Sequence, residues 1–305
     1  MTSQEPRPVP GRPHAVVPGL PDPGRCLVMG VVNVTPDSFS DGGRWFDADA
    51  AVAHGVELAE QGADIVDVGG ESTRPGATRP EPDEELHRVL PVVEGLVAQG
   101  VVVSVDTMRA DTARRAIARG AALVNDVSAG LADEQMAAVV RDTGVPWVLM
   151  HWRGHADRMA DLAVYDDVVH DVLHELNSRV ETLVAAGVRP EQLIVDPGLG
   201  FAKTGDHNWS VLGAIDEFVT QGLPLLVAAS RKRFLGQLLA DPDTDELRPA
   251  DRRDDATAAV TMQAALCGAW CVRVHDVPPN VDAVLVASRW GAALAEQRNG
   301  QMNSS

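Results

Sequence analysis

The sequence is poor in cysteine, in basic residues and in long apolar runs, and each shortage excludes a class of protein. Three cysteines, Cys26, Cys267 and Cys271, are too few and wrongly spaced for a disulfide framework or a zinc cluster. Lys and Arg total 26 against 44 Asp and Glu, and the net charge of −18 argues against binding to nucleic acid or to an anionic membrane surface. No apolar run reaches the roughly 20 residues of a membrane span.

The start of the chain does not resemble a secretory signal, because no apolar segment there precedes a cleavage site. Free cysteines are commonly reduced and buried as small apolar residues. We therefore expect a cytoplasmic protein that binds neither nucleic acid nor membrane. If its substrate is an anion, the binding site must be locally positive within an acidic protein.

The two ends of the chain differ in composition from the rest. Residues 1–24 are rich in proline and glycine, and residues 294–305 include the polar stretch "QRNGQMNSS". Neither segment has enough apolar surface to offset the entropy lost on ordering, so we expect two flexible tails. No linker or low-complexity stretch separates them, which predicts a single domain over residues 25–293.

Eight short runs rich in Val, Ile and Leu recur along the chain, at 26–33, 64–70, 101–106, 122–126, 146–151, 192–196, 224–230 and 270–275. Nearly unbroken apolar runs are typical of parallel strands covered on both faces. Helical patterns lie between them; one has Asp47 as its candidate N-cap and Gly62 as its stop, and another ends at Gly120. The alternation predicts an α/β protein of the (β/α)₈ TIM-barrel type.

A doubly wound open sheet is the competing architecture. Such a sheet normally carries a glycine fingerprint that opens a helix after the first strand. The segment after the first apolar run, "VTPDSFSDGG", does not open a helix. The barrel is therefore the favoured architecture.

Active sites of TIM barrels lie at the C-terminal ends of the strands, and this sequence is polar at every one of those ends. The residues there are Asn33, Asp67, Glu71, Asp106, Asn125, Asp126, His151, Asp196, Ser230, Arg231, Lys232, Arg233, Arg273, His275 and Asp276. A single such residue is equally consistent with a satisfied polar group inside the barrel. A full ring of them predicts a binding site.

The ring divides into two chemical halves. One half consists of hydrogen-bond acceptors, which suit a flat heterocycle that offers N–H and NH₂ donors. These acceptors are Asp106, Asn125 and Asp196. The other half consists of donors and cations, which suit a diphosphate or a carboxylate. These are Lys232, Arg273 and His275, the last two separated by one residue and so on the same side of a strand.

The stretch "DPGLGFAKT", residues 196–204, looks like a phosphate-binding loop at first sight. A P-loop needs a glycine directly before its lysine, and Ala202 stands there before Lys203. Asp196, which closes an apolar run, is the more informative residue. Lys203 is left as a supporting charge.

Metal binding has one weak and one stronger candidate. His151 and His155 are four residues apart, but "HWRGH" is a poor helix without a carboxylate-rich companion, so we do not expect a transition-metal site. Magnesium needs one or two oxygen ligands besides substrate phosphates, and Asn33 offers one. Two long loops, residues 33–43 and 69–80, have the length of lids or binding loops, although any surface loop would have similar composition.

Seven motifs, in order, resemble those of dihydropteroate synthase, most closely its actinobacterial form. They are "MGVVNVTPDSFSDGG", "DVGGESTRPGA", "SVDTMRADTA", "VNDVSAG", "VDPGLGFAKT", "ASRKRFLG" and "VRVHDV". The resemblance covers residues 26 to about 290. It implies a (β/α)₈ barrel that joins 4-aminobenzoate to (7,8-dihydropterin-6-yl)methyl diphosphate, giving 7,8-dihydropteroate and diphosphate in folate biosynthesis.

The resemblance also implies roles for single residues. It assigns the pterin to Asp106, Asn125, Met150, Asp196 and Lys232. It assigns the diphosphate to Asn33, Thr73, Arg273 and His275, with Asn33 also contacting Mg²⁺. It assigns 4-aminobenzoate to Phe39, Arg74, Pro75, Phe201, Lys232 and Arg233, and catalysis to Asp41, Arg74, Asp106, Asp196 and Lys232. Arg233 departs from the family pattern, because many members have a small residue after the "SRK" lysine.

The mechanism implied by the resemblance is dissociative: diphosphate leaves first, and the pterin-methyl cation is then attacked by the arylamine. Sulfonamides are expected to compete with 4-aminobenzoate, and the chain is expected to form a homodimer. Two other functions stay open. A pterin-dependent methyltransferase domain would have no use for "SRK" and "RVH", and a non-catalytic pterin-binding paralogue would tend to lack strand-end residues.

Overall fold

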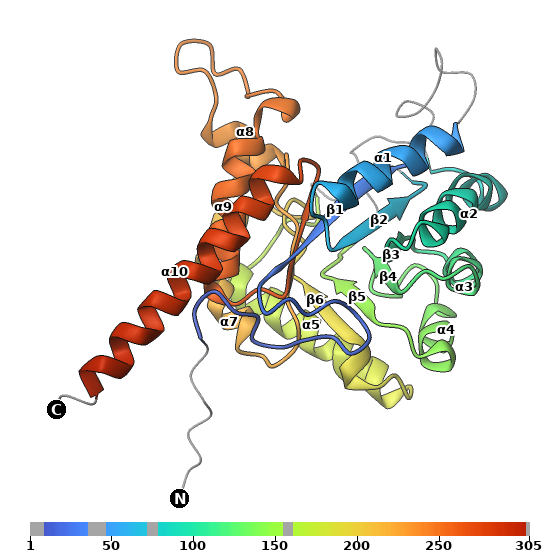
Figure 1. The fold of residues 1–305 in the computed structure, drawn as a ribbon, viewed down its shortest axis with the longest axis horizontal. Coiled ribbons are helices and arrows are strands. Elements are labelled where there is room, and N and C mark those ends of the chain that lie inside the picture. Colours follow the sequence, from blue (N-terminus) through green and yellow to red (C-terminus); the bar gives the residue numbers. More distant parts are fainter. Residues whose placement is uncertain (1–8, 36–46, 72–78, 155–160, 303–305) are drawn as a thin grey trace, which may run out of the picture.

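Eight parallel strands stand at the centre of the molecule. The computed structural model describes residues 9–35, 47–71, 79–154 and 161–302 (Figure 1). The strands are β1 (Leu27–Asn33), β2 (Ile65–Gly69), β3 (Val103–Asp106), β4 (Leu123–Asp126), β5 (Trp147–Met150), β6 (Leu193–Asp196), β7 (Leu226–Val227) and β8 (Cys271–Val274). Each lies within one of the eight predicted apolar runs.

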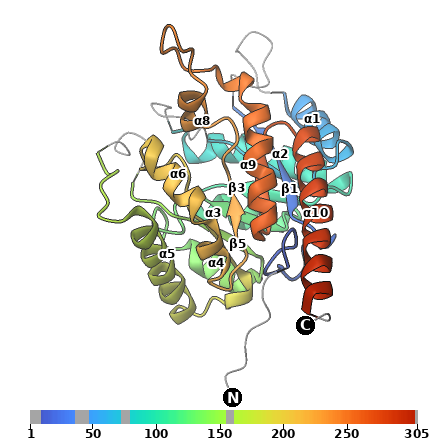
Figure 2. The same ribbon diagram turned by 90° about the vertical axis from the view of Figure 1, so that its left-hand side faces the viewer.

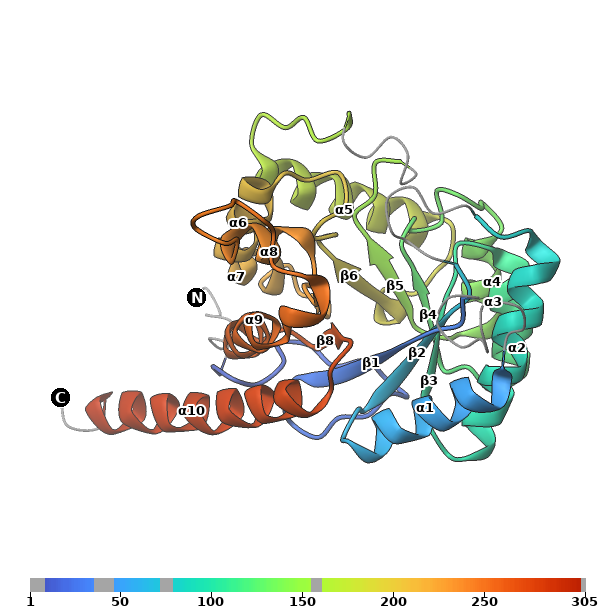
Figure 3. The ribbon, with the colours of Figure 1, turned by 90° about the horizontal axis from the view of Figure 1, so that it is seen from above.

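The sheet closes on itself. Its strand order is β6-β5-β4-β3-β2-β1-β8-β7, and a parallel bridge between Val195 and Leu225 joins its two ends. Seen from above, the strands surround the centre and the helices form an outer ring (Figure 3). The predicted (β/α)₈ barrel is confirmed.

Helices follow the strands and cover the outside of the barrel (Figures 2 and 3). They are α1 (Ala48–Glu60), α2 (Pro82–Ala98), α3 (Ala110–Ala118), α4 (Met136–Thr143), α5 (Val168–Ala185), α6 (Gly205–Gly213), α7 (Ile215–Val219), α8 (Arg233–Leu238), α9 (Asp254–Cys267) and α10 (Pro278–Met302). Asp47 caps α1 as predicted, since its side chain accepts a hydrogen bond from the backbone N–H of Ala50. Gly62 follows the helix with φ of 106°, a conformation that favours glycine.

The strand register brings the polar strand ends to one level. In neighbouring strands Asn33 pairs with Gly69, Gly69 with Asp106, and Asp106 with Asn125. Met150 pairs with Asp196 in the same way. Residues far apart in sequence therefore meet in one row at the mouth of the barrel.

Apolar side chains form two clusters, one between strands and helices and one inside the barrel. The inner cluster includes Leu27, Met29 and Ile65, which lie toward the N-terminal ends of their strands. The hydrogen-bonded strand-end residues lie toward the opposite end. Among the described helices, none is long and apolar enough to cross a membrane.

The predicted flexible N-terminal tail is wrong for residues 9–24. Gly11 and His14 donate backbone hydrogen bonds to Leu266 and Gly268 at 3.1 and 3.0 Å, which ties the segment to the end of α9. Val17 is 3% exposed and belongs to the inner cluster, with Leu20 packed against it. These two apolar residues let a proline-rich segment close the bottom of the barrel. Residues 1–8 lie outside the described part of the chain.

The predicted C-terminal tail over residues 294–305 is also wrong in most of its length. Helix α10 continues to Met302 and runs beside α9 beyond the body of the barrel (Figures 1 and 3). Residues 292–298 read "AALAEQR", a run of strong helix formers. Local propensity therefore carries the helix past the point where the composition looks polar. Residues 303–305 are not described.

Val17→Ala is expected to lower the free energy of unfolding by about 2 kcal/mol, because it removes two methyl groups from a buried cluster. Val16→Ala is the matched control, since Val16 is 53% exposed; its effect should stay below about 0.5 kcal/mol. Urea unfolding measures both variants. Equal effects would show that this segment does not pack into the barrel.

Candidate active site

A hydrogen-bonded cluster from four strands occupies the centre of the barrel mouth. Arg273 of β8 donates from Nε to Asp67 Oδ2 at 2.6 Å and from Nη2 to Asp106 Oδ2 at 2.8 Å. Asn125 of β4 donates from Nδ2 to the same Asp67 oxygen at 2.9 Å. Asp67 has no exposed surface, and its Oδ1 has no hydrogen-bond partner within the described residues.

This cluster determines which atoms are presented to a ligand. The Asp67 carboxylate accepts hydrogen bonds, so the amide of Asn125 must turn its NH₂ group toward it. The carbonyl oxygen of Asn125 is then the atom left for a donor from a ligand. Burial raises the pKa of Asp106 to about 7, and the charge of Arg273 opposes the change. The predicted acceptor half of the site is thus organised by Arg273.

Asp196, the third predicted acceptor, lies on a tight turn between β6 and α6. Its Oδ1 accepts from the backbone N–H of Gly198 at 2.7 Å. Gly198 has φ of 67°, and a Cβ at this position would lie 2.4 Å from the His151 carbonyl oxygen. Only glycine fits there, because both the backbone conformation and the space exclude a side chain. Burial raises the pKa of Asp196, and Lys232 counteracts it.

Lys232 and Phe201 meet beside this turn. Lys232 Nζ donates to the carbonyl oxygen of Leu199 and lies 4.6 Å from the centroid of the Phe201 ring. Burial lowers the pKa of Lys232 to about 8, and Asp196 opposes the change. A cation, an aromatic ring and a carboxylate therefore line the same side of the mouth.

Ser230, which follows β7, orients His275. The hydroxyl of Ser230 accepts from the backbone N–H of His275 at 3.2 Å and lies 2.9 Å from its Nδ1. A hydroxyl oxygen accepts up to two hydrogen bonds and donates one, so this contact with Nδ1 is compatible with either tautomer of the His275 ring. Both contacts fix the position of the ring at the barrel mouth.

The profile of the family described as "Pterin binding enzyme" matches residues 29–275, most of the barrel that carries this cluster. The chain belongs to the pterin-binding enzyme family. The dihydropteroate synthase of Mycobacterium leprae (strain TN) is 57% identical over 264 residues, which cover 86% of this chain and 93% of that protein. That of Bacillus subtilis (strain 168) is 42% identical over 254 residues, covering 83% and 84%.

Solved structures agree with the family assignment. A Xanthomonas albilineans dihydropteroate synthase with 4-aminobenzoic acid superposes with a TM-score of 0.80 at 44% identity, covering 89% of this chain and 94% of that one. A Yersinia pestis dihydropteroate synthase in a sulfonamide drug complex gives a TM-score of 0.83 at 38% identity, covering 91% and 99%. The resemblance read from the seven motifs is confirmed.

The structure brings most of the predicted family residues together, although none of their roles is tested by it. Asn33 ends β1 and is partly exposed, and Met150 is buried at the end of β5 opposite Asp196. Arg233 is exposed as the first residue of α8. The predicted residues Phe39, Asp41, Thr73, Arg74 and Pro75 lie outside the described part of the chain.

Sequence reasoning missed the parts played by Asp67 and Ser230. Asp67 stands in the sequence as one member of the polar ring, yet it contacts two of the predicted site residues. A carboxylate in the middle of an otherwise apolar strand, as in "DIVDVGG", is the available signal. Ser230 gives no comparable signal, because its contact with His275 depends on the closure of the barrel.

Both metal predictions stay predictions. Within the described residues no group of three His, Cys, Asp or Glu side chains could hold a metal ion. Magnesium has a lower requirement, because one or two protein oxygens suffice when a substrate supplies phosphate oxygens. Asn33 offers a side-chain oxygen at the end of β1, which fits that requirement and leaves Mg²⁺ a prediction.

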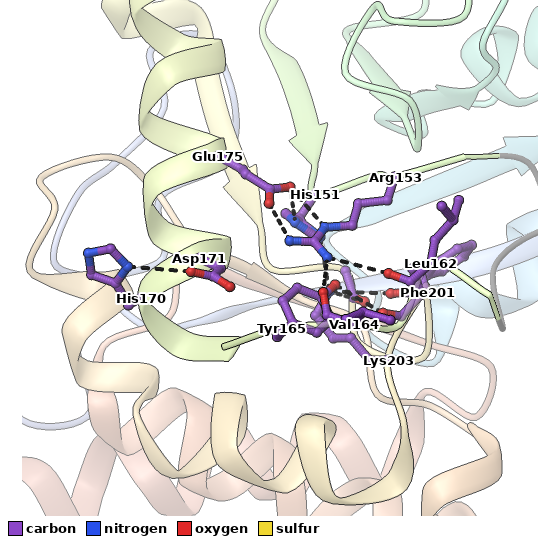
Figure 4. Close-up of polar contacts among 12 residues, drawn as sticks. His151, Arg153, Leu162, Val164, Tyr165, His170, Asp171, Glu175, Phe201 and Lys203 are labelled. Carbon is purple, nitrogen blue, oxygen red and sulfur yellow. Dashed lines mark hydrogen bonds and ion pairs between the residues drawn. The ribbon is translucent and has the colours of Figure 1, made fainter. Parts of the chain in front are cut away.

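A second polar cluster lies beside the turn after β6 (Figure 4). His151 Nε2 lies 2.9 Å from Glu175 Oε2, and its Nδ1 lies 3.0 Å from Lys203 Nζ. Arg153 also contacts Glu175 and lies over the ring of Tyr165, 3.8 Å from its centroid. Since the lysine and the carboxylate fix the two edges of the imidazole, the ring is neutral with its proton on Nε2.

The pKa values of this cluster agree with that proton assignment. Burial lowers the pKa of His151 to about 4, although the hydrogen bond to Glu175 opposes the change. Burial alone would raise the pKa of Glu175, but hydrogen bonds from His151 and Arg153 outweigh it and bring the pKa to about 2. The pair is therefore a neutral histidine beside a charged carboxylate at neutral pH.

The lowered pKa of His151 predicts a loss of stability in mild acid. The unfolded chain binds a proton on this histidine below its ordinary pKa of 6.5, whereas the folded chain does so only near 4. The unfolded state binds more protons in that window, so the contribution of His151 falls by about 2 to 3 kcal/mol as the pH drops through it.

His151→Gln should flatten the pH dependence of stability between pH 6.5 and 4. His170→Gln, at a histidine whose side chain is 76% exposed, serves as the matched control. Urea unfolding of the three proteins across this window provides the measurement. A slope that survives in the His151 variant would show that another group causes it.

Proposed function

We infer that the chain is a dihydropteroate synthase, which joins 4-aminobenzoate to (7,8-dihydropterin-6-yl)methyl diphosphate and releases diphosphate. The observation that carries this conclusion is the meeting of Asp106, Asn125 and Asp196 with Arg273 and Lys232 at one end of the barrel. Acceptors there match the N–H and NH₂ donors of a pterin. The cations beside them match a diphosphate and a carboxylate.

The pterin is proposed to lie between the central cluster and the turn after β6. Asp106, Asn125 and Asp196 accept its ring hydrogens, and Met150 packs against its face. Both carboxylates are buried, so each hydrogen bond forms in a water-poor environment where it is stronger than in bulk water. The charge of Lys232 opposes the rise in the pKa of Asp196 that burial causes.

The reaction is proposed to begin with loss of diphosphate. The bond between the pterin methylene and the diphosphate oxygen breaks, and the electron pair leaves with the oxygen. Arg273 and His275 donate to the developing negative charge, and such preorganised donors are usually the largest single contribution to catalysis. The pterin-methyl cation that remains is stabilised by the nearby carboxylates of Asp106 and Asp196.

The second step forms the carbon–nitrogen bond. The amine of 4-aminobenzoate attacks the methylene with its lone pair and then loses a proton to solvent. Phe201, Lys232 and Arg233 are proposed to hold the benzoate, together with Phe39, Arg74 and Pro75 from the predicted loops. Asp41 and Thr73 keep their predicted roles in catalysis and in diphosphate binding. Closure of these loops would keep water from trapping the cation as an alcohol.

Magnesium is proposed to bind through Asn33 and the diphosphate. When bound, Mg²⁺ supplies charge neutralisation on the leaving group. Arg273 at the end of β8 and His275 directly after it would bind the same diphosphate, so the chain itself would orient the leaving group. The donor chemistry of Asn33, a single neutral oxygen, suits a cation that is held mainly by substrate phosphates.

Three further properties are proposed. Sulfonamides compete for the 4-aminobenzoate position, as the sulfonamide complex of the Yersinia pestis relative supports. A homodimer is supported by α10, where Leu285, Val286 and Trp290 are 50%, 50% and 53% exposed and form an apolar surface. A cytoplasmic location stays a prediction.

The two rival functions fit the site less well. A pterin-dependent methyltransferase has no diphosphate to bind, so it would not account for His275 held in place by Ser230. A non-catalytic paralogue would tolerate losses in the ring, yet every predicted strand-end residue is present in the sequence. The synthase accounts for both halves of the site.

Purified protein mixed with pterin diphosphate, 4-aminobenzoate and Mg²⁺ is expected to form 7,8-dihydropteroate. His275→Ala should lower kcat by about 100-fold, because one donor to the leaving group is lost. His170→Ala, on the exposed surface of α5, is the control and should leave kcat unchanged. A wild-type protein that forms no dihydropteroate would overturn the assignment, and unchanged turnover in the His275 variant would remove that residue from the site.

A further inference from the structure

The chain has only two lysines, Lys203 and Lys232, and its other basic residues, 24 of 26, are arginines. Both lysines contact the same turn, residues 197–202 between β6 and α6. Lysine is a compact cation with three N–H donors on one atom, whereas arginine is a planar fork. Lysine occupies these two positions, whereas arginine occupies the other 24 basic positions of the chain. This distribution indicates that the turn requires an ammonium group.

Four carbonyl oxygens of the turn accept hydrogen bonds from side chains, and that of Gly198 also accepts from the backbone N–H of Phe201 at 3.1 Å. Lys203 Nζ lies 3.1 Å from the Gly198 oxygen and 3.3 Å from the Phe201 oxygen. Lys232 Nζ takes the Leu199 oxygen, and the Tyr165 hydroxyl donates to the Ala202 oxygen at 2.9 Å. Ala202 has φ of 45°, which is unfavourable for a residue with a side chain. The conformation of the turn therefore depends on contacts from outside it.

Lys203 has a partner for each of its three N–H groups. Besides the two carbonyl oxygens it reaches His151 Nδ1 at 3.0 Å, as Figure 4 shows. His151 accepts there because its Nε2 proton is directed at Glu175 on α5. Lys203 thus connects the turn to the end of β5. The contact between His151 and Glu175 extends this connection to helix α5.

Several charged and titratable groups surround the ammonium of Lys203 and bear on its charge. They are Asp196, Lys232, Arg153 and Glu175, with His151 and Tyr165 in direct or ring contact. Burial lowers the pKa of Lys203 to about 7, and Asp196 opposes the change. A neutral amine would have two N–H groups for three acceptors, so loss of the proton would release one contact.

We propose that Lys203 is a positioning residue for the aminobenzoate step: its ammonium holds the Gly198–Phe201 turn so that the Phe201 ring stays against Lys232 and forms one wall of the arylamine site. This inference rests on the proposed function. It assigns to Lys203 no contact with either substrate. Lys203 acts through the backbone oxygens of Gly198 and Phe201, which its ammonium contacts.

Lys203→Met and Lys203→Arg test the proposal. In both variants the KM for 4-aminobenzoate should rise about tenfold, because Phe201 is no longer held in place. The Kd for the pterin diphosphate should change less than this KM, since only one of its three proposed acceptors, Asp196, adjoins the turn, while Asp106 and Asn125 lie on other strands. Arginine does not rescue, because its planar fork cannot direct three N–H groups from one atom.

Arg114→Lys on α3, at a side chain that is 50% exposed, is the matched control and should leave both constants unchanged. The proposal is overturned if the KM for 4-aminobenzoate is unchanged in both Lys203 variants. It is also overturned if both constants worsen together in proportion to a loss of stability, which is the behaviour of a residue with a purely structural role.

A second measurement does not depend on the variants folding or on turnover. Wild-type protein labelled with ¹³C at lysine Cε should give two lysine signals, because the chain has two lysines. Adding a sulfonamide to the protein with pterin and diphosphate should shift both signals, since filling the arylamine site presses on Phe201. A Lys203 signal that does not respond contradicts the proposal. A wild-type protein that forms no dihydropteroate would, by contrast, overturn only the proposed function.

Discussion

The carboxylate of Asp67 is held at the centre of the barrel without exposed surface, and Arg273 compensates its charge there. A buried carboxylate without such a partner would cost several kcal/mol. The same oxygen fixes the amide of Asn125, while the other arm of Arg273 holds Asp106. One ion pair between β2 and β8, the two strands that flank β1, therefore sets the directions of Asn125 and Asp106 at the barrel mouth. The acceptor pattern proposed for a pterin follows from it.

The rest of the site is built outward from this centre. Asp196 completes the acceptors from the opposite side, and the turn that follows it brings Phe201 to Lys232. His275 is directed by Ser230, so the proposed diphosphate side is ordered by a hydroxyl and the proposed pterin side by a carboxylate. Apolar residues fill the lower barrel and the N-terminal segment closes it, which leaves the polar cluster at the mouth as the part open to a ligand.

The fold and the ring of polar residues were predictable because both depend on local patterns. Apolar runs specify buried parallel strands, and a TIM barrel places their ends together. The partners within the ring were not predictable, since Asp67 and Arg273 are 206 residues apart in sequence. The N-terminal segment was misjudged because composition does not reveal that Val17 finds a place inside the barrel. The C-terminal stretch was misjudged because the preceding helix formers, in "AALAEQR" at residues 292–298, favour continuation of the helix.

The most direct test of the account is the affinity for a pterin of Asp67→Asn compared with Asp64→Asn. Asp64 pairs with Arg25 at 2.8 Å at the other end of the barrel. Each substitution therefore removes a carboxylate that pairs with an arginine, and both carboxylates lie on or next to β2. The account predicts that calorimetry gives a pterin Kd at least about tenfold higher for the Asp67 variant, because Arg273 loses the negative charge that it pairs with and an NH₂ group replaces one acceptor oxygen. It predicts a wild-type Kd for the Asp64 variant. Equal affinities in the two variants would contradict it.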